Sequence, residues 1–175
     1  DPFQPEVAVA VSERSVHLLG ANTHPLLLES LYRWRAELDR IGTPAGYYLQ
    51  SDLPRLPESV RVLILPNPYT ISETEADAID ALLARGGTVV YTCAPGICNG
   101  EHPNPHRIGR ITGFEVDACP EDTGPVTITD TFTGRTHRIL GQDWRPRFAI
   151  TGNRGDTIAT YADTYYEWRA GVCPS

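Results

Sequence analysis

Apolar runs alternate with helical periodicities along the first part of the chain. Residues 7–11 form a continuous apolar run that ends at a polar segment, 12–14, which is typical of a strand buried on both faces of a parallel sheet. A loop containing Gly20 and Asn22 is expected next, and Pro25 then offers a helix start. One helical face carries apolar residues at steps of three and four, namely Leu27, Leu31, Trp34, Leu38 and Ile41. The pattern predicts a strand and then a helix that ends before Gly42.

Two further apolar runs predict the next strands. Residues 47–49 are a short strand candidate, and the proline-rich segment 51–57 is expected to lack regular structure. Residues 60–65 give another apolar run, interrupted only by Arg61, and it stops at Pro66 because proline lacks a backbone donor.

A second helix is predicted between residues 72 and 86. Ser72 and Glu75 have the spacing of a capping box, and Gly86 with Gly87 ends the helix. Its predicted apolar face consists of Ala76, Ile79, Leu82 and Leu83. Residues 88–92 follow as another buried strand. Long helices between apolar strands indicate parallel crossovers, so the fold class is α/β, a three-layer sandwich with a mostly parallel central sheet.

The pattern changes beyond residue 97. A loop rich in Pro, Gly and His leads to a short helix around Ile108, and residues 126–129 and 136–140 then read as a β-hairpin around Thr133 and Gly134. Residues 148–151 and 157–161 predict two more short strands. We therefore expect a single domain over 1–175, with an α/β core at 6–96 and a loop-rich β extension at 97–175.

Composition narrows the classes of partner. The chain is 41% hydrophobic and 21% charged with a net charge of −7, and its fifteen basic residues form no stripe, so nucleic acid is not an expected partner. No apolar stretch approaches the roughly 20 residues that span a bilayer, so no membrane partner is expected. The chain begins at Asp1 without Met or a leader, so any targeting segment is expected to lie outside it, and both cytoplasmic and secreted locations stay open. We also expect the chain to be a fragment of a larger protein.

Four cysteines are too few to hold a fold of this length by disulfides. Cys93 and Cys98 could close a small loop or remain free thiols beside a strand end, and a bridge between Cys119 and Cys173 also stays open. The chain is compatible with either redox compartment.

Loops at the carboxyl ends of the parallel strands are where this class of fold binds ligands. They carry the candidate ligand-binding residues Glu13, Arg14, Asn67, Tyr69 and Gly96. For Glu13 and Arg14 the alternative is a solvated ion pair at a strand end.

Three further groups of residues are of types that can carry a function. Cys98, His102 and His106 recur at intervals of four, but Pro103 and Pro105 forbid the helix that would gather them, so no metal site is expected unless a loop collects them with Cys93. The tripeptide 154–156, Arg-Gly-Asp, is explained by a turn at its glycine. The aromatic residues Tyr165, Tyr166 and Trp168 fit a carbohydrate platform or a subunit contact as well as a cover for a sheet edge.

Several segments in joint order resemble the β-galactosidase trimerisation domain, a flavodoxin-like or class I glutamine amidotransferase-like module. They cover most of residues 6–165 and are segments 31–42, 51–53, 62–69, 82–96 and, more weakly, 158–163. The resemblance implies a sheet order of 2-1-3-4-5. It also implies that this module mediates subunit contacts, while the catalytic carboxylates lie in a barrel outside this chain. The residues after Tyr161 depart from the pattern, because they lack a glycine-rich closing strand.

Cys93 occupies the place where the similar amidotransferases carry their nucleophile. Their turn reads Gly-x-Cys-x-Gly, whereas residues 91–95 read Tyr-Thr-Cys-Ala-Pro, and their downstream His-x-Glu pair is missing because His137 precedes Arg138 and Ile139. We therefore expect a non-catalytic scaffolding or oligomerisation module without a cofactor. Its expected partners are itself or other domains of its parent protein. The alternatives are a degenerate amidotransferase-like hydrolase that uses Cys93, and a domain that binds a small ligand or carbohydrate.

Overall fold

A computed structural model gives the structure of the protein for residues 3–19, 31, 34–40, 42–92, 94–98, 103–119, 126–129, 136–139, 147–151, 155–156 and 159–161. The chain divides into two compact units, Asp1–Gly113 and Phe114–Ser175. The expectation of one domain with a boundary at residue 97 stays a prediction. No helix among these residues combines the length and the apolar character needed to cross a bilayer.

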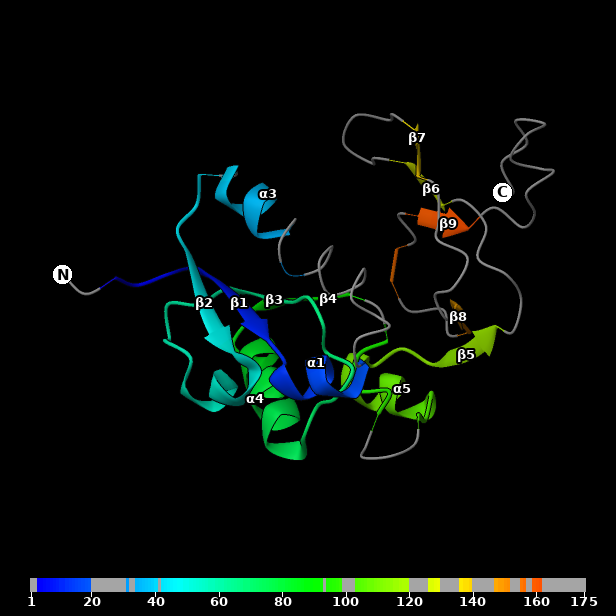
Figure 1. Cartoon of the computed structure of the whole chain (residues 1–175), viewed down its shortest axis with the longest axis horizontal. Coiled ribbons are helices and arrows are strands. Elements are labelled where there is room, and N and C mark those ends of the chain that lie inside the picture. Colours follow the sequence, from blue (N-terminus) through cyan, green and yellow to red (C-terminus); the bar gives the residue numbers. More distant parts are fainter. Residues whose placement is uncertain are drawn as a thin grey trace. The chain divides into compact units, whose positions relative to one another are not determined.

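A parallel four-stranded sheet forms the centre of the first unit (Figure 1). Its strands are β1 (Val7–Val11), β2 (Ala45–Leu49), β3 (Val62–Leu65) and β4 (Thr88–Tyr91), in the order β2-β1-β3-β4. Val9 lies beside Tyr47 on one side and Ile64 on the other. The fold is a flavodoxin-like α/β sandwich, as predicted, and the observed order matches the first four strands of 2-1-3-4-5. A fifth strand of this sheet is not among the described residues.

The larger of two apolar cores lies between one face of the sheet and three helical segments, α4 (Glu73–Ala84), η3 (Gln50–Arg55) and α5 (His106–Thr112). Its buried members include Ala8, Leu63, Leu65, Leu53, Ile79, Leu82 and Ile111. Each leucine or isoleucine buried this deeply stabilises the fold by roughly 2 kcal/mol relative to an exposed one.

The opposite face of the sheet is covered in part by α3 (Trp34–Arg40). Leu38 of this helix packs with Val9 and Ile64 in a second core. The chain moves from β1 outward to β2 and then back across to β3, so right-handed crossovers place the first connection and the later ones on opposite faces. Residue 31 and this helix are the only described parts of the long helix expected from Pro25 to Ile41; residues 20–30 lie outside the described part.

Helix α4 begins and ends where the sequence predicts. The Ser72 Oγ accepts from the backbone N–H of Glu75 at 3.3 Å, and Glu75 Oε2 accepts from the Ser72 N–H at 2.7 Å, which completes the capping box. The expected apolar face was wrong at one position, because Leu83 is 45% exposed while Leu82 is buried. One residue along a helix turns the side chain by about 100°, which carries Leu83 away from the core.

Two helical segments appear where the sequence predicts none. Helix α1 (Glu13–Leu19) directly follows β1, and Ser12 initiates it by accepting from the Ser15 N–H at 3.2 Å. The segment expected to be irregular contains the 3-10 helix η3, which runs through Pro54 because a short turn of this kind needs few backbone donors. Strand β4 was expected to be buried, but its residues are exposed or half-buried.

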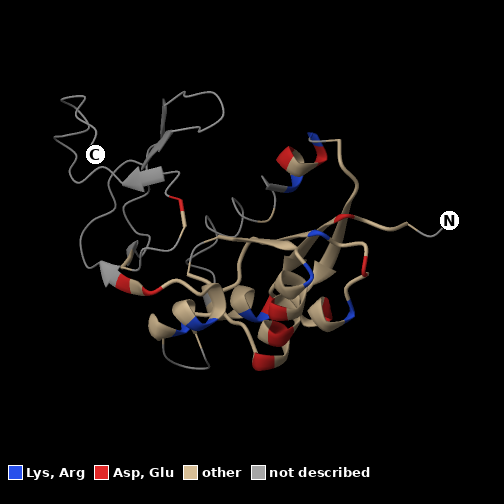
Figure 2. Cartoon of the chain, turned by 180° about the vertical axis from the view of Figure 1, so that it is seen from behind, with Lys and Arg blue, Asp and Glu red and all other residues tan. Residues whose placement is uncertain are grey.

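Helix α5 confirms the short helix expected around Ile108. Its Arg110 pairs with Asp80 at 3.4 Å and with Glu73 at 3.8 Å, and Arg107 lies 3.7 Å from Glu73. Figure 2 shows acidic and basic positions on the helices of this unit. Exposed ion pairs of this kind each contribute about 1 kcal/mol or less, so they tune the docking of α5 rather than cause it.

The second unit holds short antiparallel strands. Strand β5 (Val116–Cys119) pairs with β8 (Arg147–Ile150), and β6 (Val126–Thr129) lies between β7 (Thr136–Ile139) and β9 (Ala159–Tyr161). The predicted hairpin and the two later strands are confirmed, whereas β5 was missed. In the described residues these strands form two sheets of their own and do not lengthen the parallel sheet. The expected turn at Thr133 and Gly134 lies outside the described residues.

Candidate functional site

The carboxyl ends of β1 and β3 mark the point where the strand order reverses, and a pair of residues closes it. Asn67 Oδ1 accepts from the Ser12 N–H at 2.9 Å, and Asn67 Nδ2 donates to the Ser12 carbonyl oxygen, also at 2.9 Å. Both residues are 1% exposed. Ligands of open α/β folds usually enter at this crevice. Here the amide that was predicted to bind a ligand fills it by pairing with the backbone.

Three hydroxyl groups lie beside this pair. Ser15 Oγ donates to Ser12 Oγ at 2.9 Å and is 3.2 Å from Thr70 Oγ1, and the Thr70 N–H donates to Ser15 Oγ at 3.1 Å. Ser12 and Ser15 are almost completely buried. Buried hydroxyls are stable only when they are hydrogen-bonded, and these bond mainly to one another. They tie α1 to the loop after β3.

A buried carboxylate, Glu75, gathers donors from three segments. Its Oε2 accepts from the Ser72 N–H at 2.7 Å, from Gln50 Nε2 at 3.1 Å and from Arg14 Nη2. The Glu75 side chain is 5% exposed, whereas that of Arg14 is 54% exposed. Arg14 therefore pairs with Glu75, which comes from another part of the chain. It does not pair with its neighbour Glu13, so the alternative of a solvated ion pair between Glu13 and Arg14 was wrong. Sequence reasoning identified Glu75 only as a helix cap.

Gln50 is the second residue that sequence reasoning missed. Its Nε2 donates to the Thr70 carbonyl oxygen at 2.6 Å as well as to Glu75, and the residue is 2% exposed. Its Oε1 is the one buried side-chain polar atom without a hydrogen-bond partner among the described residues. The sequence signal for it is weak, because a polar residue that follows a predicted strand is most often on the surface.

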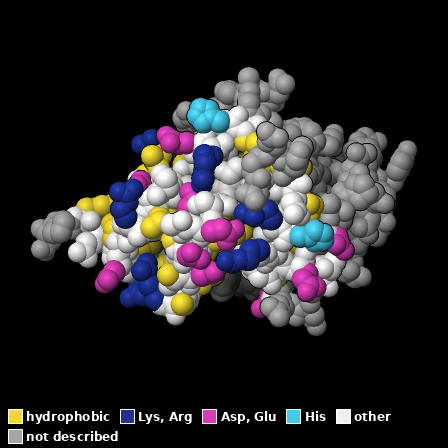
Figure 3. All heavy atoms as spheres, turned by 90° about the horizontal axis from the view of Figure 1, so that it is seen from below, with side chains coloured by type: hydrophobic (Ala, Val, Ile, Leu, Met, Phe, Trp, Pro, Cys, Tyr) yellow, Lys and Arg dark blue, Asp and Glu magenta, His cyan; other side chains and the backbone are white. Residues whose placement is uncertain are grey.

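Two hollows flank Arg14 along this edge. The first, of about 300 Å³, lies at the ends of β1 and β2 and is lined by residues that include Val11, Glu13, Arg14, Leu49, Gln50 and Glu75. The second, of about 470 Å³, is lined by residues that include Arg14, His17, Thr70 and Cys98. Figure 3 shows acidic and basic side chains intermingled on the face that it presents.

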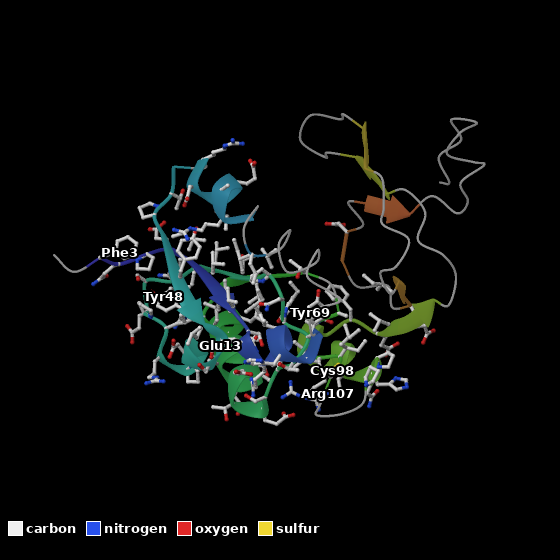
Figure 4. All side chains as sticks on the ribbon, in the orientation of Figure 1. Phe3, Glu13, Tyr48, Tyr69, Cys98 and Arg107 are labelled. Carbon is white, nitrogen blue, oxygen red and sulfur yellow. The ribbon has the colours of Figure 1, made fainter. Side chains whose placement is uncertain are left out.

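The five predicted ligand residues do not form one site. Glu13 and Arg14 line the first hollow, while Asn67, Tyr69 and Gly96 are buried, and none of these three is among the lining residues of either hollow. The Gly96 N–H donates to the Pro68 carbonyl oxygen at 2.7 Å, which joins the loops after β3 and β4. Figure 4 shows Glu13, Tyr69, Cys98 and Arg107 toward the carboxyl ends of the strands.

The backbone and the packing at position 96 both favour glycine. Its φ of +68° lies in the left-handed region, and a Cβ there would come within 2.8 Å of Ile111 Cγ1. Arg107 of α5 secures the same loop, because its Nε donates to the Gly96 carbonyl oxygen and its Nη2 to that of Ile71, each at 3.2 Å. The loop after β4 is thus fixed against α5.

Of the two cysteines near the end of β4, the structure describes Cys98. Cys98 is a free thiol, partly buried, and burial raises its pKa above the usual value. Cys93 and His102 lie outside the described residues, and His106 is exposed at the start of α5. In the described part of the chain no three metal-binding side chains come together. Catalysis by Cys93 and a metal site with His102 stay predictions.

The remaining motifs also fall largely outside the described residues. Tyr165, Tyr166, Trp168 and Arg154 are in this group. Gly155 has a φ of +100°, which fits the turn expected there.

Three solved structures of β-galactosidases are similar to this chain. Gan42B, a GH42 β-galactosidase, is similar with a TM-score of 0.54 and 21% identity over 94% of this chain and 24% of that one. The catalytic mutant of Gan42B from G. stearothermophilus gives a TM-score of 0.56 with the same identity and coverage. A β-galactosidase from Bifidobacterium adolescentis gives a TM-score of 0.45 and 20% identity over 95% of this chain and 81% of that one.

The likeness to Gan42B establishes the fold, and this chain spans about a quarter of the length of that enzyme. No family model matches the sequence, and no curated protein matches it.

Proposed function

We propose that this chain is a non-catalytic module of a β-galactosidase-like glycoside hydrolase, and that it contacts other subunits or domains of its parent protein. The shared fold supports the first part, because the similarity to Gan42B covers 94% of this chain but only 24% of that enzyme. A module of this kind holds other parts of a protein in place and needs no reactive groups of its own.

The observation that carries the proposal is the closed switch point. Asn67 and Ser12 pair there through two buried hydrogen bonds, where a catalytic or cofactor-binding member of this fold class keeps an open crevice. The neighbouring hydroxyl groups of Ser15 and Thr70 bond within the same cluster. The polar groups at this point stabilise the fold and leave no aligned set for acid–base chemistry.

The carboxylates at this edge also fit a structural role. Glycoside hydrolysis requires two carboxyl groups placed on either side of the scissile bond. Glu75 accepts three hydrogen bonds on one oxygen and is buried, so it is committed to holding Arg14, Gln50 and Ser72. Glu13 is exposed beside it.

The test compares the parent protein with a version that lacks residues 1–175. Sedimentation velocity is expected to give a smaller assembly for the shortened protein, and the 175-residue chain alone is expected not to hydrolyse a nitrophenyl galactoside. A parent that is strictly monomeric at high concentration in both versions, without a change in domain packing by small-angle scattering, would contradict the contact role. Hydrolysis by the chain alone that is lost in Glu75→Gln would contradict the non-catalytic role.

A further inference from the structure

Strand β2 is an edge of the parallel sheet, and it lacks the features that usually keep an edge from pairing. Among the described residues its only neighbouring strand is β1 (Figure 1). Its five residues, Ala45–Leu49, include no charged residue and no proline, and the pairing with β1 runs through all five positions without a bulge. Proteins protect open edges with charges, prolines or bulges, because an unprotected edge pairs with another strand.

Every second residue of β2 points its backbone groups away from β1. The Glu6 carbonyl oxygen accepts from the N–H at the start of β3 at 3.0 Å, so Glu6 and every second residue after it point toward β3. Val9 therefore points toward β2, where its register partner is Tyr47. A residue in a parallel ladder bonds to the two neighbours of its partner, so Tyr47 points its own N–H and C=O outward, as do Ala45 and Leu49.

The edge also exposes large apolar side chains on one face of the sheet. Tyr47 is 44% exposed and Leu49 is 42% exposed. Neighbours hold Tyr47 in place, because its hydroxyl donates to Asp39 Oδ1 at 3.3 Å and the Arg35 guanidinium carbon lies 5.5 Å from the centre of its ring. Tyrosine and arginine carry much of the affinity of protein interfaces, and a side chain that is already held loses little freedom on binding.

The sequence of β2 complements itself in an antiparallel pairing. A two-fold axis at Tyr47 places this residue opposite Tyr47 of a second copy, and it places Leu49 opposite the small Ala45. The residues that meet in hydrogen-bonded pairs are then the three whose backbone groups point outward, and each such pair exchanges its N–H and C=O groups. A large side chain meets a small one on the same face, so the pairing avoids a clash of two leucines.

The charge distribution favours contact at this edge. The whole chain has a net charge of −7, so two copies repel each other. Residues 34–57, which contain α3, β2 and η3, carry as many basic as acidic side chains, namely Arg35, Arg40, Arg55, Glu37, Asp39 and Asp52. The edge is therefore a neutral region of an acidic protein, and salt that screens the remaining repulsion is expected to strengthen a contact made there.

We propose that a second copy of this chain pairs with β2 along this edge, antiparallel and centred on Tyr47, so that the two parallel sheets become one. The inference rests on the proposed contact role and names the surface and the partner. The two-fold arrangement closes as a dimer and leaves no further open edge on β2. A contact made mainly by one strand from each copy is small, so the dimer is expected to be weak, with a Kd in the micromolar range.

Sedimentation velocity of the 175-residue chain tests the proposal. A monomer–dimer equilibrium is expected between about 5 and 500 µM, and it is expected to shift toward dimer when the salt concentration rises from 50 to 300 mM. Leu49→Lys places a charge at an exposed position of the edge and is expected to weaken the dimer at least tenfold with little change in Tm. Leu83→Lys is the matched control, because Leu83 is 45% exposed on α4, and its dimer is expected to be unchanged.

Cross-linking tests the register. Residue 47 is the one position of β2 that faces itself across the two-fold axis, and the roughly 5.5 Å between the Cα atoms of a hydrogen-bonded pair suits a disulfide. Tyr47→Cys is expected to form a covalent dimer on mild oxidation, above the level of the unsubstituted chain and of Leu83→Cys. A chain that stays monomeric at 500 µM, a dimer that Leu49→Lys leaves unchanged, or no additional cross-link in Tyr47→Cys would overturn the proposal. The deletion in the parent protein judges the contact role separately, so that role can stand while the pairing of β2 fails.

Discussion

The side-chain amide of Asn67 pairs with the backbone of Ser12 in both directions, at 2.9 Å for each hydrogen bond. It therefore acts as a peptide group of a neighbouring strand would, and it joins the ends of β1 and β3 beyond the last backbone pair of the sheet. An aspartate would place a second carboxylate oxygen against the Ser12 carbonyl, so only an amide serves both bonds. This residue explains why the crevice is closed.

Removal of this amide is expected to destabilise the fold. Asn67→Ala leaves the buried Ser12 N–H without its acceptor, while the Ser12 carbonyl oxygen still accepts from the Val16 N–H at 3.2 Å. We expect a loss of about 2–3 kcal/mol in the free energy of unfolding, since an orphaned buried donor and a small cavity both contribute. Urea unfolding followed by circular dichroism measures it.

The matched control for this substitution is Asn104→Ala. Asn104 is exposed, and its Oδ1 accepts one hydrogen bond from the His106 N–H at 3.1 Å. Its removal is expected to cost about 1 kcal/mol or less. Equal losses in the two variants would contradict the structural role assigned to Asn67.

Gly96 and Gly42 provide a second matched pair. Both have a positive φ, +68° and +72°, but a Cβ at Gly96 would meet Ile111 at 2.8 Å whereas one at Gly42 would meet nothing within 4 Å. Gly42→Ala is expected to cost about 1 kcal/mol for the left-handed backbone alone, and Gly96→Ala about 2–4 kcal/mol because overpacking is added. Chemical denaturation of both variants checks this; a Gly96→Ala variant as stable as Gly42→Ala would mean that the α5 contact yields without cost.

Tyr91 is expected to make stability fall at high pH. Burial, with a smaller contribution from Asp80, raises the pKa of Tyr91 to about 12 from 10.0. The unfolded chain loses this proton first, so the stabilisation is fully present below pH 10 and is lost as the pH rises toward 12. After allowance for the partly exposed ring, the loss by pH 11 is about 1 kcal/mol. The chain contains no lysine, so the other side chains that titrate near this window are the remaining tyrosines and the cysteines, which are unchanged in a variant of Tyr91 alone.

The measurement compares the free energy of unfolding at pH 9 and pH 11 in the native protein and in Tyr91→Phe. The variant also loses the hydrogen bond from the Tyr91 hydroxyl to the Ile111 carbonyl oxygen, which lowers its free energy of unfolding already at pH 9. The quantity compared is therefore the fall from pH 9 to pH 11 within each protein. The fall with pH is expected to be shallower in the variant. Tyr47→Phe is the control, because Tyr47 is 44% exposed and a smaller effect is expected there. If the free energy of unfolding falls with pH equally in the native protein and in Tyr91→Phe, the raised pKa of Tyr91 is contradicted.

Local patterns were sufficient to predict the parallel sheet and its helices. Strands β1 and β3 are continuous apolar runs because helices cover both of their faces, and the capping box of Ser72 and Glu75 is set by residues only three apart. The helix α1 was missed for the opposite reason. Its sequence is polar at the start and too short to show an apolar period, so only the capping role of Ser12 indicated it.

The side-chain partners at the carboxyl edge of the sheet could not be predicted from the sequence. Asn67 was identified as a polar residue in the right loop, but its partner lies 55 residues away, and no local rule distinguishes an amide that binds a ligand from one that binds the backbone. The same holds for Gln50 and Arg14, whose shared partner Glu75 lies 25 and 61 residues away. Side-chain partners across such distances follow from the fold and are not visible in spacing.

The two cysteines near β4 are expected to be alkylated more slowly than an activated nucleophile would be. Burial raises the pKa of the Cys98 thiol, which lowers its thiolate fraction at pH 7, and the thiolate is the reacting form. We expect iodoacetamide to modify Cys98 more slowly than N-acetylcysteine at pH 7, with the difference narrowing above pH 9. Peptide mass spectrometry resolves the rate at each cysteine, and Cys98→Ser confirms the assignment of that signal.

Cys93 is expected to react no faster than N-acetylcysteine, because residues 91–95 lack both glycines of the nucleophile turn. A much faster rate at Cys93, lost in Cys93→Ser but kept in Cys98→Ser, would favour the amidotransferase-like alternative over a non-catalytic module.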